Sequence, residues 1–151
     1  MKVSLSKSFS PVKAQGTNTS GVPMLRSEGA RVILGSDGGA LVQSITPSAH
    51  LMFGPRGVCL HPDGSLWVAD TGHHRILGWK RVPTADDTPA DILLGQPEFG
   101  REGRNAKGPV GANTLNVPTG ITAFRGGLAV ADPWNHRVLI WRDTPTGPDH
   151  Q

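Results

Sequence analysis

The 151-residue sequence predicts an all-β protein assembled from repeated small antiparallel sheets. The main observation is an internal repeat, because GSLWVADTGHHRILGW at residues 64–79 returns as GGLAVADPWNHRVLIW at residues 126–141. A second observation is that 20 glycines and 13 prolines mark frequent turns, which favour short strands over helices. Self-similarity at a fixed spacing indicates a stacked or radial array of one supersecondary unit.

The repeat extends upstream of these two segments. Residues 55–58 match residues 118–121, and VILG at residues 32–35 matches ILLG at residues 92–95. We therefore expect four strands in each unit, with VILG as the last strand of a preceding unit. No further ILLG segment follows Trp141, which leaves two interpretations. Either the chain is a piece of a longer repeat protein, or the stretch at residues 32–35 or another part of the assembly supplies the missing strand.

Each predicted strand holds four or five aliphatic, β-branched or aromatic residues bounded by Gly, Pro, Asp or Asn. Asp63–Gly64 and Gly126–Gly127 supply the positive φ angles of tight hairpins, so the flanking strands should be antiparallel neighbours. No segment keeps a 3.6-residue apolar period, and helices should be few. The strands are expected to begin at Val32, Gly57, Leu66, Arg75, Asp91, Gly120, Gly127 and Arg137.

The chain divides into a leader and a repeat portion. Residues 1–30 are rich in Ser, Lys, Gly, Thr and Pro and are expected to be flexible. Residues 31–151 hold the repeats, with one strand at about 31–35, a first unit at about 55–95 and a second at about 118–145. We find no apolar run near the length of a membrane span and no signal-peptide core, which favours a cytoplasmic location without membrane contact.

Cysteine content and charge narrow the function classes. Cys59 is the single cysteine, so an intramolecular disulfide is impossible, and its strand-like surroundings predict a buried thiol. The net charge of +3 and the sequence pI of about 9.5 give a mild basic bias, which by itself is too weak to indicate nucleic-acid binding.

Two segments carry a resemblance to a known family. GVxxxxxGxLWVADTxxHRIL at residues 57–77 and PTGITAFRGGLAVADPWNHRVLIW at residues 118–141 resemble the NHL repeat, whose first two letters correspond to Asn135 and His136. ADILLGQPEF at residues 90–99 is similar to the spacer between repeats of bacterial NHL proteins. The resemblance covers about residues 31–145 and implies a partial β-propeller of about two four-stranded antiparallel blades.

A closed propeller ring needs about four to eight blades, so roughly two blades leave open faces and edges. The resemblance therefore implies a partner that completes the ring. One possibility is a homo-oligomer, such as a trimer of two-blade chains that closes a six-bladed ring. The other is the remainder of a longer propeller.

The recurring polar residues are interpreted as architecture. An Asp ends the second strand of each unit and an Arg begins the third, so the carboxylate can accept bonds from loop amides while the guanidinium crosses the loop. A residue that geometry needs once per unit recurs in every unit, whereas a catalytic residue need occur once per protein. This structural motif comprises Asp70, Arg75, Asp132, His136 and Arg137.

A rim of loops is the candidate binding site. In propellers that resemble this chain, loops between blades and within blades share one rim, which here includes the basic loop at residues 95–116. Trp134 replaces Gly72 in one of these loops, and an exposed aromatic is a binding candidate, whereas Trp67, Trp79 and Trp141 should lie between blades. The candidate rim residues are Arg56, His73, His74, Arg101, Arg104, Lys107, Trp134 and Asn135.

The sequence favours a non-catalytic scaffold that binds a protein or another ligand through this rim, and leaves catalysis open. His73 and His74 are adjacent, but neighbouring strand residues point apart and metal-binding patterns such as HExxH are absent, so no metal or cofactor is expected. One alternative is a metal-assisted lyase or lactonase with ligands on the propeller axis. A second is an RNA-binding propeller, which is disfavoured because Trp134 is the only aromatic candidate for base stacking at the rim.

Overall fold

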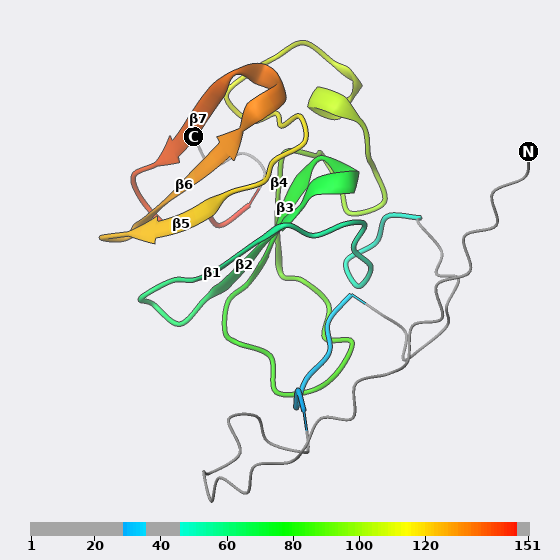
Figure 1. Cartoon of the computed structure of the whole chain (residues 1–151), viewed down its shortest axis with the longest axis vertical. Helices are drawn as coiled ribbons and strands as arrows, with labels where there is room; N and C mark the ends of the chain where they lie inside the picture. Colours follow the sequence, from blue (N-terminus) through cyan, green and yellow to red (C-terminus); the bar gives the residue numbers. More distant parts are fainter. Residues whose placement is uncertain (1–28, 36–45, 148–151) are drawn as a thin grey trace, which may run out of the picture.

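A computed structural model describes residues 29–35 and 46–147, which form two antiparallel β-sheets packed against each other (Figure 1). The first sheet contains β1 (Gly57–Leu60), β2 (Leu66–Asp70), β3 (Arg75–Trp79) and β4 (Ile92–Leu94). The second contains β5 (Ile121–Phe124), β6 (Gly127–Asp132) and β7 (Arg137–Trp141). The all-β prediction is confirmed.

No α-helix occurs in the described ranges, where three short 3₁₀ turns interrupt the loops. The turns are η1 (Thr71–His73), η2 (Arg104–Lys107) and η3 (Pro133–Asn135). The flexible segment predicted for residues 1–30 lies outside the described residues except at its last two positions.

The two sheets repeat the same pairing register. Leu66 pairs with Trp79 and Asp70 with Arg75 between β2 and β3, and residues 62 positions later pair identically between β6 and β7. The hairpins that precede them turn on Gly64 and Gly126, whose φ angles are 90° and 93°. Because an L side chain rarely adopts such a φ, these glycines explain why the chain reverses there.

In the described part of the chain the second sheet has three strands where the first has four. Residues 142–147 contain no counterpart of the ILL segment that forms β4, which agrees with the missing fourth strand that the sequence analysis noted for this unit. The strand predicted at residues 31–35 belongs to neither sheet. This segment is extended, and its one ladder contact is a parallel bridge between Gly35 and Leu51, because no neighbouring strand lies beside it in the described part of the chain.

The largest apolar cluster lies between the two sheets. Trp67, Ala69 and Ile76 of the first sheet face Leu128 and Val130 of the second, and all five are fully buried. Trp141 joins this cluster, as the sequence predicted, whereas Trp79 belongs to a second cluster on the other face of the first sheet. Burial of such side chains is the main stabilising contribution to this stack.

Candidate functional site

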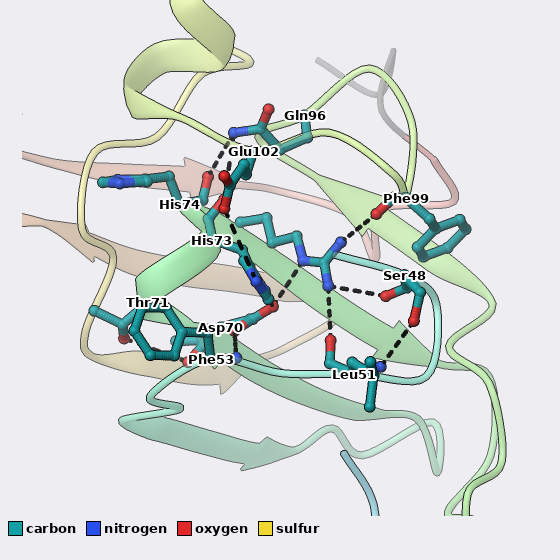
Figure 2. Close-up of polar contacts among 12 residues, drawn as sticks. Ser48, Leu51, Phe53, Asp70, Thr71, His73, His74, Gln96, Phe99 and Glu102 are labelled. Carbon is teal, nitrogen blue, oxygen red and sulfur yellow. Dashed lines mark hydrogen bonds and ion pairs between the residues drawn. The ribbon is translucent and has the colours of Figure 1, made fainter. Parts of the chain in front are cut away.

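A buried carboxylate organises the turn between β2 and β3. Oδ1 of Asp70 accepts the backbone N–H of Phe53 at 2.7 Å. Oδ2 of the same carboxylate accepts Nδ1–H of His73 at 2.8 Å and Nε–H of Arg75 at 2.7 Å (Figure 2). The side chains of Asp70, His73 and Arg75 are all 0% exposed. A carboxylate at this depth is compatible with folding because both oxygens accept charge-assisted or backbone hydrogen bonds.

The guanidinium of Arg75 extends this network to two distant segments. Its Nη1–H donates to the carbonyl of Phe99 at 2.7 Å, in the loop after β4. Its Nη2–H groups donate to the carbonyls of Ser48 and Leu51 at 2.9 and 2.8 Å, before β1 (Figure 2). One planar side chain therefore joins three parts of the chain. We call Asp70, His73 and Arg75 the first staple.

The second sheet repeats the arrangement with one chemical change. Asp132 accepts the backbone N–H of Asn116 at 2.7 Å, Nδ2–H of Asn135 at 2.7 Å and Nε–H of Arg137 at 2.9 Å. Nη2 of Arg137 donates to the carbonyls of Gly111 and Thr114. Asn135 thus takes the place of His73, because both side chains donate an N–H to the carboxylate three residues before them. We call Asp132, Asn135 and Arg137 the second staple.

A left-handed residue follows η1 and η3. His74 has a φ of 57° and His136 a φ of 55°, and each precedes the staple arginine. His136 is exposed, so its side chain lies outside the buried network. His74 differs, since its Nδ1 accepts the backbone N–H of Val117 at 3.0 Å, which links the turn of the first sheet to the loop before the second.

A cluster with two exposed members, Arg104 and Trp134, forms where the basic loop meets η3. The guanidinium carbon of Arg104 lies 5.1 Å from the ring centroid of Trp134, within cation–π range. Beside it, Nδ2 of Asn135 donates to Oδ1 of Asn105 at 2.8 Å, and Nδ2 of Asn105 donates back to Oδ1 of Asn135 at 3.3 Å. We call Arg104, Asn105, Trp134 and Asn135 the rim cluster. Trp134 is 57% exposed, so its second face is open to solvent.

The positive charge of this cluster affects the pKa of the nearby His74. Burial lowers the pKa of the His74 imidazole from its ordinary value of 6.5, and the positive charge of Arg104 lowers the pKa further. The hydrogen bond from Val117 acts in the same direction, because an Nδ1 that accepts an N–H must be unprotonated. These effects favour the neutral form of the His74 imidazole in the folded protein.

Acidification should destabilise the protein through His74. In the unfolded chain this histidine takes up a proton as the pH falls through about 6.5, while its folded-state pKa is lower, so protons favour the unfolded state. The free energy of unfolding, measured by urea titration, should fall between about pH 7.5 and about pH 5.5. The variant His74→Asn, which tolerates the left-handed φ, should lose less stability over this interval than the wild type. Equal losses in both proteins would contradict this assignment.

The structure does not gather all predicted rim residues. His73 is 0% exposed and occupied by the first staple, so it presents no surface. Arg101 is exposed and pairs with Glu98 at 3.3 Å. Arg56 and Lys107 are exposed, and neither side chain has a hydrogen bond or ion pair to the rim cluster in the part of the chain that the structure describes.

Two residues that position the site were missed from the sequence. Gln96 is 3% exposed, and its Nε2–H groups donate to the carbonyls of His74 and Gly103 at 3.3 and 2.8 Å, so it fastens the basic loop to the first turn. Asn105 holds a left-handed φ of 50° and pairs with Asn135. Its place between glycines in GRNAKG is typical of such a turn, and this signal could have identified it.

The exposure of Trp134 follows from a paired difference between the repeats. At the equivalent position of the first repeat, a Cβ on Gly72 would collide with the ring of Phe53. The residue equivalent to Phe53 is Asn116, which is shorter and leaves this place open for a side chain at position 134. The tryptophan is therefore a local addition rather than part of the repeated architecture.

Among the described residues, no group of three or more His, Cys, Asp or Glu side chains is placed to hold a metal ion. Within the same residues, no helix has the length and apolarity needed to cross a lipid bilayer.

Stacked antiparallel sheets with an Asp–Arg staple at the same turn define a repeat protein built from propeller-type blades. The NHL repeat family model matches residues 54–79, which include β1 to β3. The chain is also similar to NHL repeat-containing protein 2 of Bos taurus, with 30% identity over 99 residues, or 65% of this chain and 12% of that protein. Residues 54–79 of this chain therefore hold an NHL repeat.

The chain spans 12% of the length of the curated relative, so the activity of that whole protein is not carried over to this chain. The relative is bovine, and the bacterial affiliation suggested by residues 90–99 stays a prediction. The NHL repeat and the two sheets together show a partial propeller of the type used as an interaction domain.

Proposed function

We propose that this chain is a non-catalytic interaction module that binds a protein partner through the rim cluster. The observation that carries the proposal is that the repeated and the non-repeated polar residues have different roles. The repeated Asp and Arg residues form the two staples, where their hydrogen bonds stabilise the fold. Trp134 and Arg104 have no such role and form an exposed pair that occurs in one repeat only.

The chemistry of the rim cluster favours a peptide with an acidic and an apolar side chain. Trp134 offers a large rigid surface at low entropic cost, and tryptophan and arginine are enriched among residues that dominate binding energy. The nearby loop adds Arg101 and Lys107, both exposed, to the positive field of Arg104, although Glu98 and Glu102 offset part of it. An acidic peptide would be drawn to this field and an apolar side chain would pack on the indole.

Peptide display provides a test with a defined probe. Peptides selected from a random library on the immobilised chain are synthesised, and their dissociation constants are measured for the wild type, Trp134→Ala and Arg104→Glu. Each variant should weaken binding by about tenfold or more, since a central anchor contributes about 2 kcal/mol. Arg125→Glu is the matched control, because Arg125 is exposed in the β5–β6 turn, at the other end of the strands from η3.

Two outcomes would contradict the proposal. One is that selected peptides bind Trp134→Ala and Arg104→Glu as tightly as the wild type. The other is that no peptide is selected while a single-stranded oligonucleotide binds with an affinity that falls steeply with salt, which would indicate phosphate contacts instead.

A further inference from the structure

The outer face of the second sheet is equivalent, through the repeat, to a face that is buried in the first. Trp67, Ala69 and Ile76 lie on the first sheet's inner face and pack against the second sheet. Their equivalents 62 positions later lie on the outer face of the second sheet, which no other described element covers. These equivalents are Ala129, Ala131 and Val138.

This outer face is apolar and open. Val138 and Ile140 of β7 are 60% and 63% exposed, and Phe124 of β5 is 40% exposed. A shallow hollow of about 320 Å³ lies on it, lined by Gly120, Ile121, Thr122, Ala129, Ala131 and Val138. Contiguous exposed apolar residues of this kind mark an interaction surface.

The edge of β7 that faces away from β6 also has no neighbouring strand in the described chain. In the first sheet β3 pairs with β4 on this edge, and Nη1–H of Arg75 donates to Phe99 beyond β4. Nη1 of Arg137 has no acceptor among the described residues, and its side chain is 24% exposed where that of Arg75 is 0% exposed. Both differences arise because the described residues place no fourth strand beside β7.

Residues 32–35 are placed as a fourth strand whose own sheet is missing. They match β4 in sequence, and the bridge of Gly35 to Leu51 corresponds to the bridge of Gly95 to Thr114. Leu34 packs on the second apolar cluster, on the outer face of the first sheet. In the same way, Leu94 of β4 packs in the cluster between the two sheets. The segment therefore sits against the first sheet as β4 sits against the second.

The backbone of this segment has one edge engaged and one edge available. Ile33 donates its N–H to Oδ1 of Asp86 at 2.7 Å and accepts the N–H of Asp87 at 3.0 Å. Adjacent residues of an extended chain direct their backbone groups to opposite edges. Val32 and Leu34 therefore direct theirs away from this loop, to the side where a third strand of a sheet would lie.

We propose that copies of this chain associate head to tail, with residues 32–35 of one copy completing the second sheet of the next. The repeat fixes the register of this pairing between copies. Through the repeat, the residue pairs between β3 and β4 correspond to the pairs of Ile140 with Val32 and of Val138 with Leu34. The segment and β7 lie at opposite ends of the two-sheet stack (Figure 1), so a chain cannot join them within itself. A second copy is the fitting partner because this one sequence supplies both halves of the contact.

Head-to-tail association would also cover two exposed apolar residues of β1. Val58 and Leu60 of β1 are 69% and 62% exposed on the outer face of the first sheet. Their equivalents in the second sheet, Ile121 and Ala123, pack against the cluster between the sheets. Head-to-tail stacking would bury Val58 and Leu60 of one copy on the open face of its neighbour. Such a contact is heterologous, so it produces a ring if the rotation closes and a filament if it does not.

Complementation between two blocked variants tests this geometry. Ile140→Asp blocks the open face of the second sheet, and Leu60→Asp blocks the outer face of the first. We expect the wild-type chain to exceed monomer mass in native mass spectrometry and sedimentation at about 50 µM, well above the micromolar dissociation constants typical of weaker interfaces. Each variant alone should be monomeric, and an equimolar mixture should give a one-to-one dimer that grows no further.

Controls keep a folding defect apart from lost association. Both substituted residues are more than 60% exposed, and circular dichroism checks that each variant is folded. Val110→Asp, at another exposed apolar residue, should associate like the wild type. Val32→Pro, which removes a backbone donor from the pairing strand, should behave like Leu60→Asp. A monomeric wild-type chain, or a mixture of the two blocked variants that stays monomeric, would overturn the proposal.

Discussion

Replacement of Asp70 by asparagine is expected to destabilise the fold by about 3–5 kcal/mol, because it leaves the Arg75 guanidinium buried without its counter-charge. The side chains of Asp70, His73 and Arg75 are all 0% exposed, so water cannot replace the lost carboxylate. The free energy of unfolding from urea titration measures the effect. Loss of the cooperative transition would mean that the cost exceeds the total stability.

The second staple supplies a graded comparison. Asp132→Asn should cost less than Asp70→Asn, since the side chain of Arg137 is 24% exposed and water can solvate part of its charge. Glu98→Gln is the surface control, because the ion pair of Glu98 with Arg101 is well exposed and should contribute about 1 kcal/mol or less. Equal effects at positions 70 and 98 would contradict the structural role of the staple.

Truncation of Trp67 to alanine is expected to cost about 3–5 kcal/mol, the usual range for a large aromatic removed from a core. The indole is 0% exposed between the sheets, and its Nε1–H donates to Oγ of Ser65 at 2.8 Å. Gly78 on β3 lies against the ring, where a Cβ would collide with it, so this residue has no side chain that could fill the cavity. Thermal or urea unfolding measures the loss.

Trp134→Ala is the matched control for this substitution. The same side chain is removed, but from a site that is 57% exposed, and the change in stability should stay within about 0.5 kcal/mol. This expectation also serves the binding experiment, because it separates a weaker ligand contact from a weaker fold. A Trp67→Ala variant as stable as Trp134→Ala would show that the sheets do not pack through this ring.

The strands could be predicted because the repeat preserves the alternation of side chains. A segment such as LWVAD keeps its apolar and polar positions in register with GLAVAD, and both form the second strand of a sheet. The staples were also within reach of the sequence, since Asp and Arg five residues apart bracket each turn. His73 was placed at the rim because its equivalence to Asn135 as a donor to the carboxylate is evident only from coordinates.

The rim cluster could not be assembled from the sequence. Arg104 and Trp134 are 30 positions apart, and their contact depends on the left-handed run at residues 105–107, which turns the basic loop back toward η3. Val117 illustrates the same limit. It adopts a φ of 57°, unusual for a β-branched residue, and the equivalent Gly54 adopts 58°. The fold imposes this conformation, and only the glycine reveals it in the sequence.

The hydrogen bonds of Arg75 to distant segments influence how the chain unfolds. Its guanidinium holds carbonyls at residues 48, 51 and 99, so the first sheet is fastened by segments on both sides of the unit that repeats in sequence. Local opening of any one of these segments leaves an N–H group of the buried Arg75 guanidinium without its acceptor, which couples the unfolding of these segments. The cooperative building block is thus longer than one motif and overlaps its neighbour, and a cut placed at the boundary between motifs would divide it.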